Sequence, residues 1–154
     1  HNREALMITI DTSLSARRVT RELDRLTEWR GTPEVIRVDN GPEFTSAAFE
    51  AWTRKNGIKL CFIQPGKPTQ NTLIERFNGS YRKEVLNAHL FTDLDQVRDQ
   101  TQQWIWEYNN NRPHESLGNK PPVKFMRERR KNVFPSLIID SHLKKNITFT
   151  NASD

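Results

Sequence analysis

Hydrophobic positions recur along this chain at two spacings, one typical of strands and one typical of helices. From Leu6 to Ile10 every second residue is apolar, which predicts a strand over residues 5–11. Apolar residues then recur at intervals of three and four, which predicts a helix that ends near Trp29, before a glycine and a proline. The chain therefore begins with a strand followed by an amphipathic helix.

The same alternation of spacings continues through most of the chain. The further elements that it predicts are a strand over 35–39, a helix over 46–56, a strand over 58–63, a helix over 72–88, a helix over 93–110 and a short basic helix over 121–131. Strands that alternate with helices predict an α/β fold with parallel strands joined by right-handed crossovers. In such folds ligands bind at the carboxyl ends of the strands, where Asp39 is expected.

The C-terminal residues allow two interpretations. Residues 147–150 fit a short strand, whereas residues 136–154 as a whole also fit a tail. We therefore expect a core over residues 1–131 and a C-terminal tail over residues 132–154, whose structure the sequence does not determine.

Length and charge narrow the class of protein. A chain of 154 residues predicts one domain. The net charge of +5 suits a polyanionic partner, although ordinary soluble proteins also carry such a charge. Cys61 is the one cysteine, which excludes an internal disulfide and fits a reducing cytoplasm, and we interpret it as a buried strand residue. No apolar run approaches the length of a membrane span.

Two acidic residues lie at the end or near the start of predicted elements, at places that suit a metal site. Asp39 ends a predicted strand, and Glu75 lies near the start of a predicted helix. Carboxylate oxygens are preferred ligands of Mg²⁺ and Mn²⁺. Two such ions bound at one site can together support phosphoryl transfer. Each motif also has a structural interpretation, because Asp-Asn-Gly favours a turn and residues 72–75 fit a helix capping box. Taken alone, each short motif favours the structural interpretation.

An ordered series of motifs changes this balance. Residues 38–44, 65–71, 75–79, 108–109 and 112–118 have the sequences VDNGPEF, PGKPTQN, ERFNG, YN and RPHESLG. Over about residues 3–128 the chain resembles the catalytic core of the retroviral-integrase-like transposases of bacterial insertion sequences. This resemblance implies a ribonuclease-H-like α/β fold, in which a mixed sheet is flanked by helices.

The resemblance also implies a chemistry. Asp39 and Glu75 would be the second and third carboxylates of the family's Asp-Asp-Glu triad and would bind Mg²⁺ or Mn²⁺. The expected activity is metal-dependent cleavage and strand transfer of DNA, at transposon ends and target, by a homo-oligomer. The residues expected to contact DNA are Lys67, Arg76, Arg82 and Lys83, of which Arg82 lies seven positions after Glu75, as the family's basic residue does.

The chain departs from the family at the first aspartate of the triad. That aspartate belongs on the first strand of the family's sheet, whereas residues 5–11 correspond to the third strand. We therefore expect a core truncated at its N-terminus that lacks the first two strands, which in the family lie between the third and the fourth. Asp11 and Asp24 are poor replacements, so we expect the chain to be inactive alone.

Other interpretations remain open. The chain fits a non-catalytic remnant that binds DNA or the full-length transposase, and, more weakly, a ribonuclease-H-type nuclease. Trp104 and Trp106 have the chemistry to stack on bases, but their place on an amphipathic helix favours core packing. We interpret His114 as structural, because no second metal ligand lies near it in the sequence.

Overall fold

The computed structural model describes residues 2–64, 72–128, 136–143 and 146–152, and for residues 136–152 it describes the backbone alone. The first half of the chain alternates strands and helices: β1 (Ala5–Ile10), α1 (Ala16–Arg30), β2 (Val35–Val38), α2 (Ala47–Lys55) and β3 (Lys59–Phe62). The second half is helical and ends in two strands: α3 (Thr72–Tyr81), the π-helical turn η2 (Arg82–Leu86), α4 (Leu94–Asn110), the 3₁₀ turn η3 (Glu115–Leu117), α5 (Pro122–Glu128), β4 (Ser136–Leu143) and β5 (Asn146–Ala152).

Polar side chains determine where three of the helices begin. The side chains of Ser15, Ser46 and Asp93 each accept a hydrogen bond from the backbone N–H three residues further on, at 3.4, 3.2 and 2.9 Å. Each bond satisfies one of the amide groups that a helix leaves unpaired in its first turn. The predicted starts of α2 and α4, at residues 46 and 93, are confirmed to within one residue. Within the described ranges, none of the helices has both the length and the apolar character needed to span a membrane.

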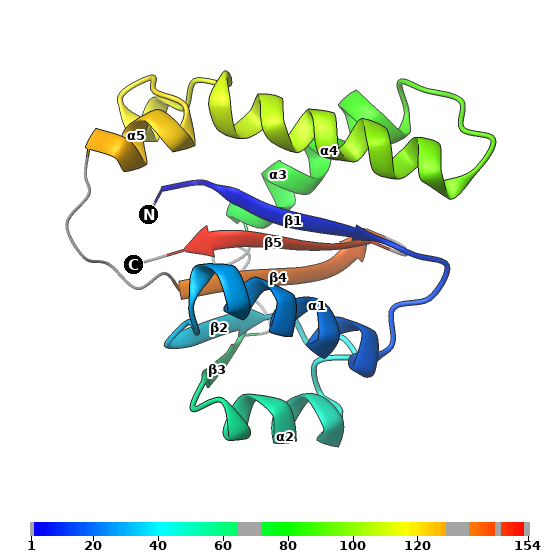
Figure 1. Cartoon of the computed structure of the whole chain (residues 1–154), viewed down its shortest axis with the longest axis vertical. Coiled ribbons are helices and arrows are strands. Elements are labelled where there is room, and N and C mark those ends of the chain that lie inside the picture. The colour runs from blue at the N-terminus through cyan, green and yellow to red at the C-terminus, as the bar shows by residue number, and fades with distance from the viewer. Residues whose placement is uncertain (1, 65–71, 129–135, 144–145, 153–154) are drawn as a thin grey trace.

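The five strands form one sheet in the order β1, β5, β4, β2, β3 (Figure 1). β2 is parallel to both β3 and β4, whereas β5 is antiparallel to β4 and to β1. The last two strands of the chain therefore lie in the middle of the sheet, and the first strand lies at its edge.

The position of β4 and β5 bears on the expectation that two strands are missing. The sequence predicts a gap between the strand of residues 5–11 and that of residues 35–39, and the C-terminal hairpin β4–β5 occupies that place. Of the two interpretations of residues 136–154, the strand is confirmed for residues 147–150, and residues 136–143 form a second strand. Local periodicity does not predict this arrangement, because the partners outside the hairpin, β2 for β4 and β1 for β5, lie about a hundred residues or more earlier in the chain.

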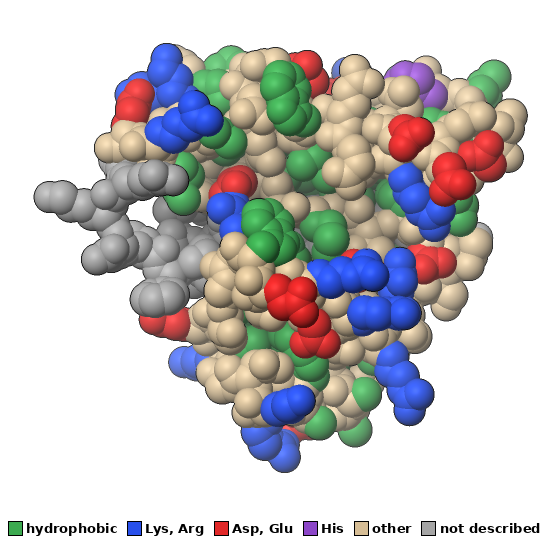
Figure 2. All heavy atoms as spheres, viewed as in Figure 1, with side chains coloured by type: hydrophobic (Ala, Val, Ile, Leu, Met, Phe, Trp, Pro, Cys, Tyr) green, Lys and Arg blue, Asp and Glu red, His purple; other side chains and the backbone are tan. Residues whose placement is uncertain are grey.

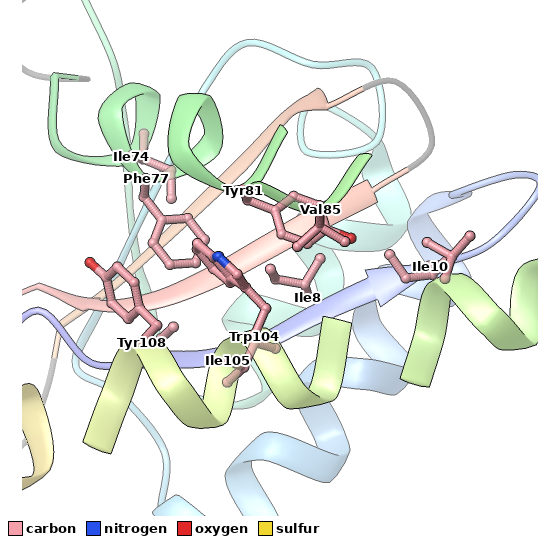
Figure 3. Packing of buried hydrophobic residues seen from close by; sticks show 11 residues of the cluster. Ile8, Ile10, Ile74, Phe77, Tyr81, Val85, Trp104, Ile105 and Tyr108 are labelled. Carbon is pink, nitrogen blue, oxygen red and sulfur yellow. The ribbon is translucent and has the colours of Figure 1, made fainter. Parts of the chain in front are cut away.

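Two hydrophobic clusters cover the two faces of the sheet. The α1-side cluster lies under α1 and α2 and contains Val19, Leu23, Leu26, Ile36, Val38, Phe44, Phe49 and Ile58. The α3-side cluster lies under α3, η2 and α4 and contains Ala5, Ile8, Ile10, Ile74, Phe77, Tyr81, Val85, Val97, Trp104, Ile105 and Tyr108. In Figure 3 the ring of Phe77 meets those of Trp104 and Tyr108 edge to face, with centroids 5.2 and 4.9 Å apart.

Three expectations about single residues have different outcomes. Trp104 is 9% exposed and packs in the core as predicted, whereas Trp106 is 57% exposed, so core packing is wrong for it. Residues two positions apart on a helix point about 200° apart, which places only one of the two toward the sheet. Cys61 lies on β3 as expected but is half-buried rather than buried. His114 is half-buried against the ring of Tyr108, which agrees with a structural role.

Candidate functional site

Asp39 lies directly after β2 and is held there by a turn. Its side chain is buried, and its Oδ1 atom accepts a hydrogen bond from the backbone N–H of Gly41 at 2.9 Å. The next residue, Asn40, donates from its side chain to the carbonyl of Ile63 at 3.2 Å and so ties the turn to the segment after β3. The structural interpretation of Asp-Asn-Gly is therefore confirmed. It does not exclude a ligand role, because a carboxylate has about four acceptor positions.

The rest of this motif fixes the turn to the core. Phe44 is fully buried in the α1-side cluster, where its ring meets that of Phe49 edge to face at 5.4 Å. Its backbone N–H donates to the carbonyl of Gly41 at 3.0 Å. Val38 on one side and Phe44 on the other thus anchor the segment that presents Asp39.

Glu75 lies in the first turn of α3 and is exposed. Ile74 and Phe77 on the same helix are buried in the α3-side cluster and fix the helix against the sheet. Val38 belongs to the α1-side cluster, and successive strand residues alternate between faces, so Asp39 belongs to the α3 side of the sheet. The two carboxylates thus belong to the same side of the sheet, one after β2 and one on the helix that covers it.

The chemical type of the two side chains fits a hard cation, but their number is smaller than a metal site needs. Asp39 and Glu75 both provide carboxylate oxygens, which Mg²⁺ prefers. Among the residues whose side chains are described, no group of three or more His, Cys, Asp or Glu residues lies close enough together to hold a metal ion. Helix α3 begins at Thr72, the first residue of the predicted capping box, and Glu75 lies in its first turn.

Three of the four cations predicted to contact DNA are exposed. Arg76, Arg82 and Lys83 lie on α3 and at the start of η2, all open to solvent. Seven residues make nearly two α-helical turns, so Arg82 lies on the Glu75 side of the helix. Lys67 lies outside the described residues.

A second group of exposed cations was missed by the sequence analysis. Arg17, Arg21 and Arg25 recur every four residues on α1 and are exposed, and Figure 2 shows Lys and Arg side chains gathered over this helix. The signal was the spacing, which places all three on one helix face. Because α1 covers the other face of the sheet, this surface is separate from Glu75.

The later motifs brace the helices around the site. Asn109 accepts from the backbone N–H of Ala5 at 2.9 Å and donates to its carbonyl at 2.7 Å, so α4 is bonded to the outer strand of the sheet. Glu84 in η2 accepts hydrogen bonds from the Trp104 ring nitrogen at 2.7 Å and from Arg112. The contacts of Glu84 join the end of α4 to η2, the turn that follows the helix of Glu75.

Electrostatics in this brace follow from burial and from Arg112. Burial alone would raise the pKa of Glu84, but the hydrogen bonds from Arg112 and Trp104 outweigh it and hold that pKa below its usual value. The Arg112 guanidinium also lies 5.5 Å from the centre of the Trp104 ring and 5.6 Å from that of Tyr108. Burial, together with the charges of Arg3 and Arg112, lowers the pKa of His114, which favours its neutral form.

The chain matches family models over most of its length. Residues 1–68 and residues 56–122 each match a model described as an integrase core domain. An insertion element IS476 protein of Xanthomonas euvesicatoria is 50% identical over 123 residues, which make up 80% of this chain and 36% of that protein. An insertion element IS407 protein of Burkholderia multivorans is 45% identical over 128 residues, or 83% of this chain and 46% of that protein. The chain thus spans less than half the length of either relative.

A solved structure shares the fold. The HTLV-2 integrase catalytic core domain in complex with magnesium, in its dimeric form, is 21% identical with a TM-score of 0.56, over 76% of this chain and 72% of that one. This likeness agrees with the predicted ribonuclease-H-like α/β fold. The two family matches cover residues 1–122 together, and the two insertion-element relatives match 80% and 83% of the chain. The chain belongs to the integrase core domain family, in the branch found in bacterial insertion elements.

Proposed function

We propose that this chain is the DNA-transferring catalytic core of an insertion-element transposase, with Asp39 and Glu75 as ligands of a divalent metal ion. The observation that carries the proposal is the position of Asp39, which a turn holds at the carboxyl end of β2, on the side of the sheet covered by the helix of Glu75. Membership of the integrase core family and the magnesium bound by the related HTLV-2 core support this assignment.

The chemistry requires little covalent work from the protein. Bound Mg²⁺, or Mn²⁺ in its place, would stabilise charge on a phosphodiester attacked by water or by a DNA 3′-hydroxyl. The turn at Gly41 keeps Asp39 in position, and the buried residues beside Glu75 keep α3 in position. The exposed cations of α3 and η2 attract the phosphates of transposon ends and target DNA.

The activity assay is metal-dependent nicking and strand transfer on a supercoiled plasmid. The sequence predicts inactivity of the chain alone because two strands are missing, but β4 and β5 occupy their place in the sheet, so we expect activity with Mn²⁺ or Mg²⁺. This activity should fall more than about a hundredfold in Asp39→Asn and in Glu75→Gln, since each removes a direct metal ligand. Asp99→Asn makes the same chemical change at an exposed position of α4 and should keep full activity. Activity that persists without added metal, or in both ligand variants, would contradict the proposal.

A second function is favoured by one observation. Within the described side chains the acidic groups at this site number two, not three, which suits a non-catalytic domain that binds DNA or the full-length transposase. This alternative predicts DNA binding without nicking in the same assay.

The surface proposed to bind DNA is tested by single cation removals. Arg82→Ala should weaken binding to duplex DNA in fluorescence anisotropy. It should also reduce the slope of log affinity against log salt concentration by the amount expected for about one phosphate contact. Arg21→Ala removes the same charge from α1, on the other face of the sheet, and should change neither quantity. The opposite result would place the DNA over α1.

We also propose that the chain acts as a homo-oligomer in the bacterial cytoplasm. Two element ends must be held together during transposition, and the related HTLV-2 core exists in dimeric and trimeric forms. Sedimentation velocity of the chain with and without DNA measures the assembly state.

A further inference from the structure

The parallel pairing of β4 with β2 brings a third acidic residue to the level of Asp39. Ile138 pairs with Arg37 and Ile139 pairs with Val38, so the next position along both strands places Asp140 beside Asp39. Neighbouring strands of a sheet lie about 4.8 Å apart. The two aspartates therefore occupy adjacent positions in the sheet although about a hundred residues separate them in the chain.

The pairing on the other side of β4 assigns Asp140 to the α3 side of the sheet. Asp140 pairs with Thr148, and Thr148 pairs with Ile8, which is buried in the α3-side cluster. Directly paired residues on neighbouring strands share a face. Asp39 has the same assignment from an independent observation, because the residue before it, Val38, belongs to the α1-side cluster.

The helix that carries Glu75 lies over the same strands. Helix α3 packs against β4 and β5, and it lies behind the sheet in Figure 1. Three acidic positions thus come to one side of the sheet from three elements: the end of β2, the middle of β4 and the first turn of α3.

Aspartate is an unfavourable choice for the position of Asp140. Residues 137–139 before it are all apolar, and the strand is the central one of the sheet. Aspartate is disfavoured inside strands, and like charges at neighbouring positions of a sheet are destabilising. A divalent cation shared by the two aspartates would offset both effects.

We propose that Asp140 is the third carboxylate ligand of the metal site of Asp39 and Glu75, so that the C-terminal hairpin completes the site. The inference rests on the function proposed above. Neither family match extends beyond residue 122, so Asp140 lies outside both. It supplies from the C-terminal end of the chain the aspartate that the sequence analysis expects to be absent.

Manganese binding tests this assignment without any measurement of activity. Titration calorimetry with MnCl₂ on the metal-free chain should show an affinity at least about tenfold weaker in Asp140→Asn, as in Asp39→Asn and Glu75→Gln. Asp99→Asn is the matched control and should bind as the unchanged chain does. In chelator, Asp140→Asn should melt no lower than the unchanged chain, because it removes a repulsion, and it should lose the rise in melting temperature that Mn²⁺ produces.

The outcomes separate this inference from the proposed function. Unchanged Mn²⁺ affinity in Asp140→Asn, with loss of binding in the other two variants, overturns the role of Asp140 and leaves the function of Asp39 and Glu75 standing. Absence of binding by the unchanged chain at millimolar Mn²⁺ overturns both. If Asp140→Asn melts at a lower temperature than the unchanged chain in chelator, Asp140→Glu is the deciding variant. It keeps a carboxylate and should bind Mn²⁺ more tightly than Asp140→Asn. Equally weak binding by the two variants overturns the inference.

Discussion

Tyr81 and Tyr108 are the only tyrosines in the sequence, and both are buried in the α3-side cluster. The Tyr81 hydroxyl lies 2.6 Å from that of Thr101, which itself donates to the carbonyl of Val97, so the Tyr81 hydroxyl is the donor. Burial raises the pKa of Tyr81, and it raises the pKa of Tyr108 to about 12. At the scale of single residues, the core beneath the site therefore resists ionisation.

These raised pKa values predict a loss of stability in alkali. An unfolded tyrosine ionises near pH 10, so the stability that Tyr108 contributes is complete below pH 10 and is lost as the pH rises toward 12. The loss from Tyr108 is about 2 kcal/mol at pH 12. Ultraviolet titration should show little phenolate in the folded chain at pH 10 and about half ionisation in urea. Phenolate that forms near pH 10 in the folded chain would contradict burial of both rings, and Tyr108→Phe should unfold at a higher pH.

At the residue scale, the ordered series of motifs predicted Asp39 and Glu75 as metal ligands, and that role stays a prediction. Glu84 was missed because its role depends on Arg112 and Trp104, which are brought to it by packing and not by spacing in the sequence.

At the scale of elements, Glu84 joins η2 to α4 and to the segment that follows it. Its carboxylate accepts from both Trp104 and Arg112, and about a third of the side chain is exposed. This contact helps to hold α3, and with it Glu75, at a fixed distance from α4. Loss of the carboxylate charge should therefore loosen the helix layer over the sheet.

Glu84→Gln measures the strength of this contact. We expect the free energy of unfolding in urea to fall by about 1 kcal/mol at pH 7, a value reduced from that of a buried charged hydrogen bond because of the exposure. The pKa of Glu84 is lowered in the folded chain, so its contribution is present above the ordinary value of 4.5 and is lost as the pH falls through the lower folded pKa. The difference between variant and unchanged chain should vanish in that acid range. Glu28→Gln on α1 should leave the free energy of unfolding unchanged at every pH. A difference between Glu84→Gln and the unchanged chain that persists in acid would refute the ionic origin of the effect.

Element-scale prediction succeeded where each element contains its own signal. Spacing of apolar residues predicted the helices, because this signal lies within a few residues. The capping side chains of Ser46 and Asp93 act at the same short range. Neighbouring residues do not predict which strands pair. The same limit explains why the sequence allows both a strand and a tail for the residues that form the C-terminal hairpin.

At the scale of the whole molecule, that hairpin determines whether the sheet is continuous. Its two strands lie between β1 and β2, which have no direct pairing with each other. The family resemblance predicted that two strands are missing between the strands of residues 5–11 and 35–39. The hairpin from the C-terminal part of the chain occupies that place, which local sequence patterns did not predict.

A disulfide cross-link tests the sheet order directly. Arg37 and Ile138 are paired on β2 and β4, and paired residues on parallel strands lie within the 4.4–6.8 Å between Cα atoms that a disulfide requires. In a Cys61→Ser background, Arg37→Cys with Ile138→Cys should oxidise to an intramolecular disulfide, seen as a mobility shift in a non-reducing gel. Val35→Cys with Ile138→Cys is the matched control, since an offset of two residues puts the Cα atoms roughly 8 Å apart. Equal cross-linking of both pairs, or of neither, would show that β4 does not lie beside β2 in this register, and Asp140 would then lose its place beside Asp39.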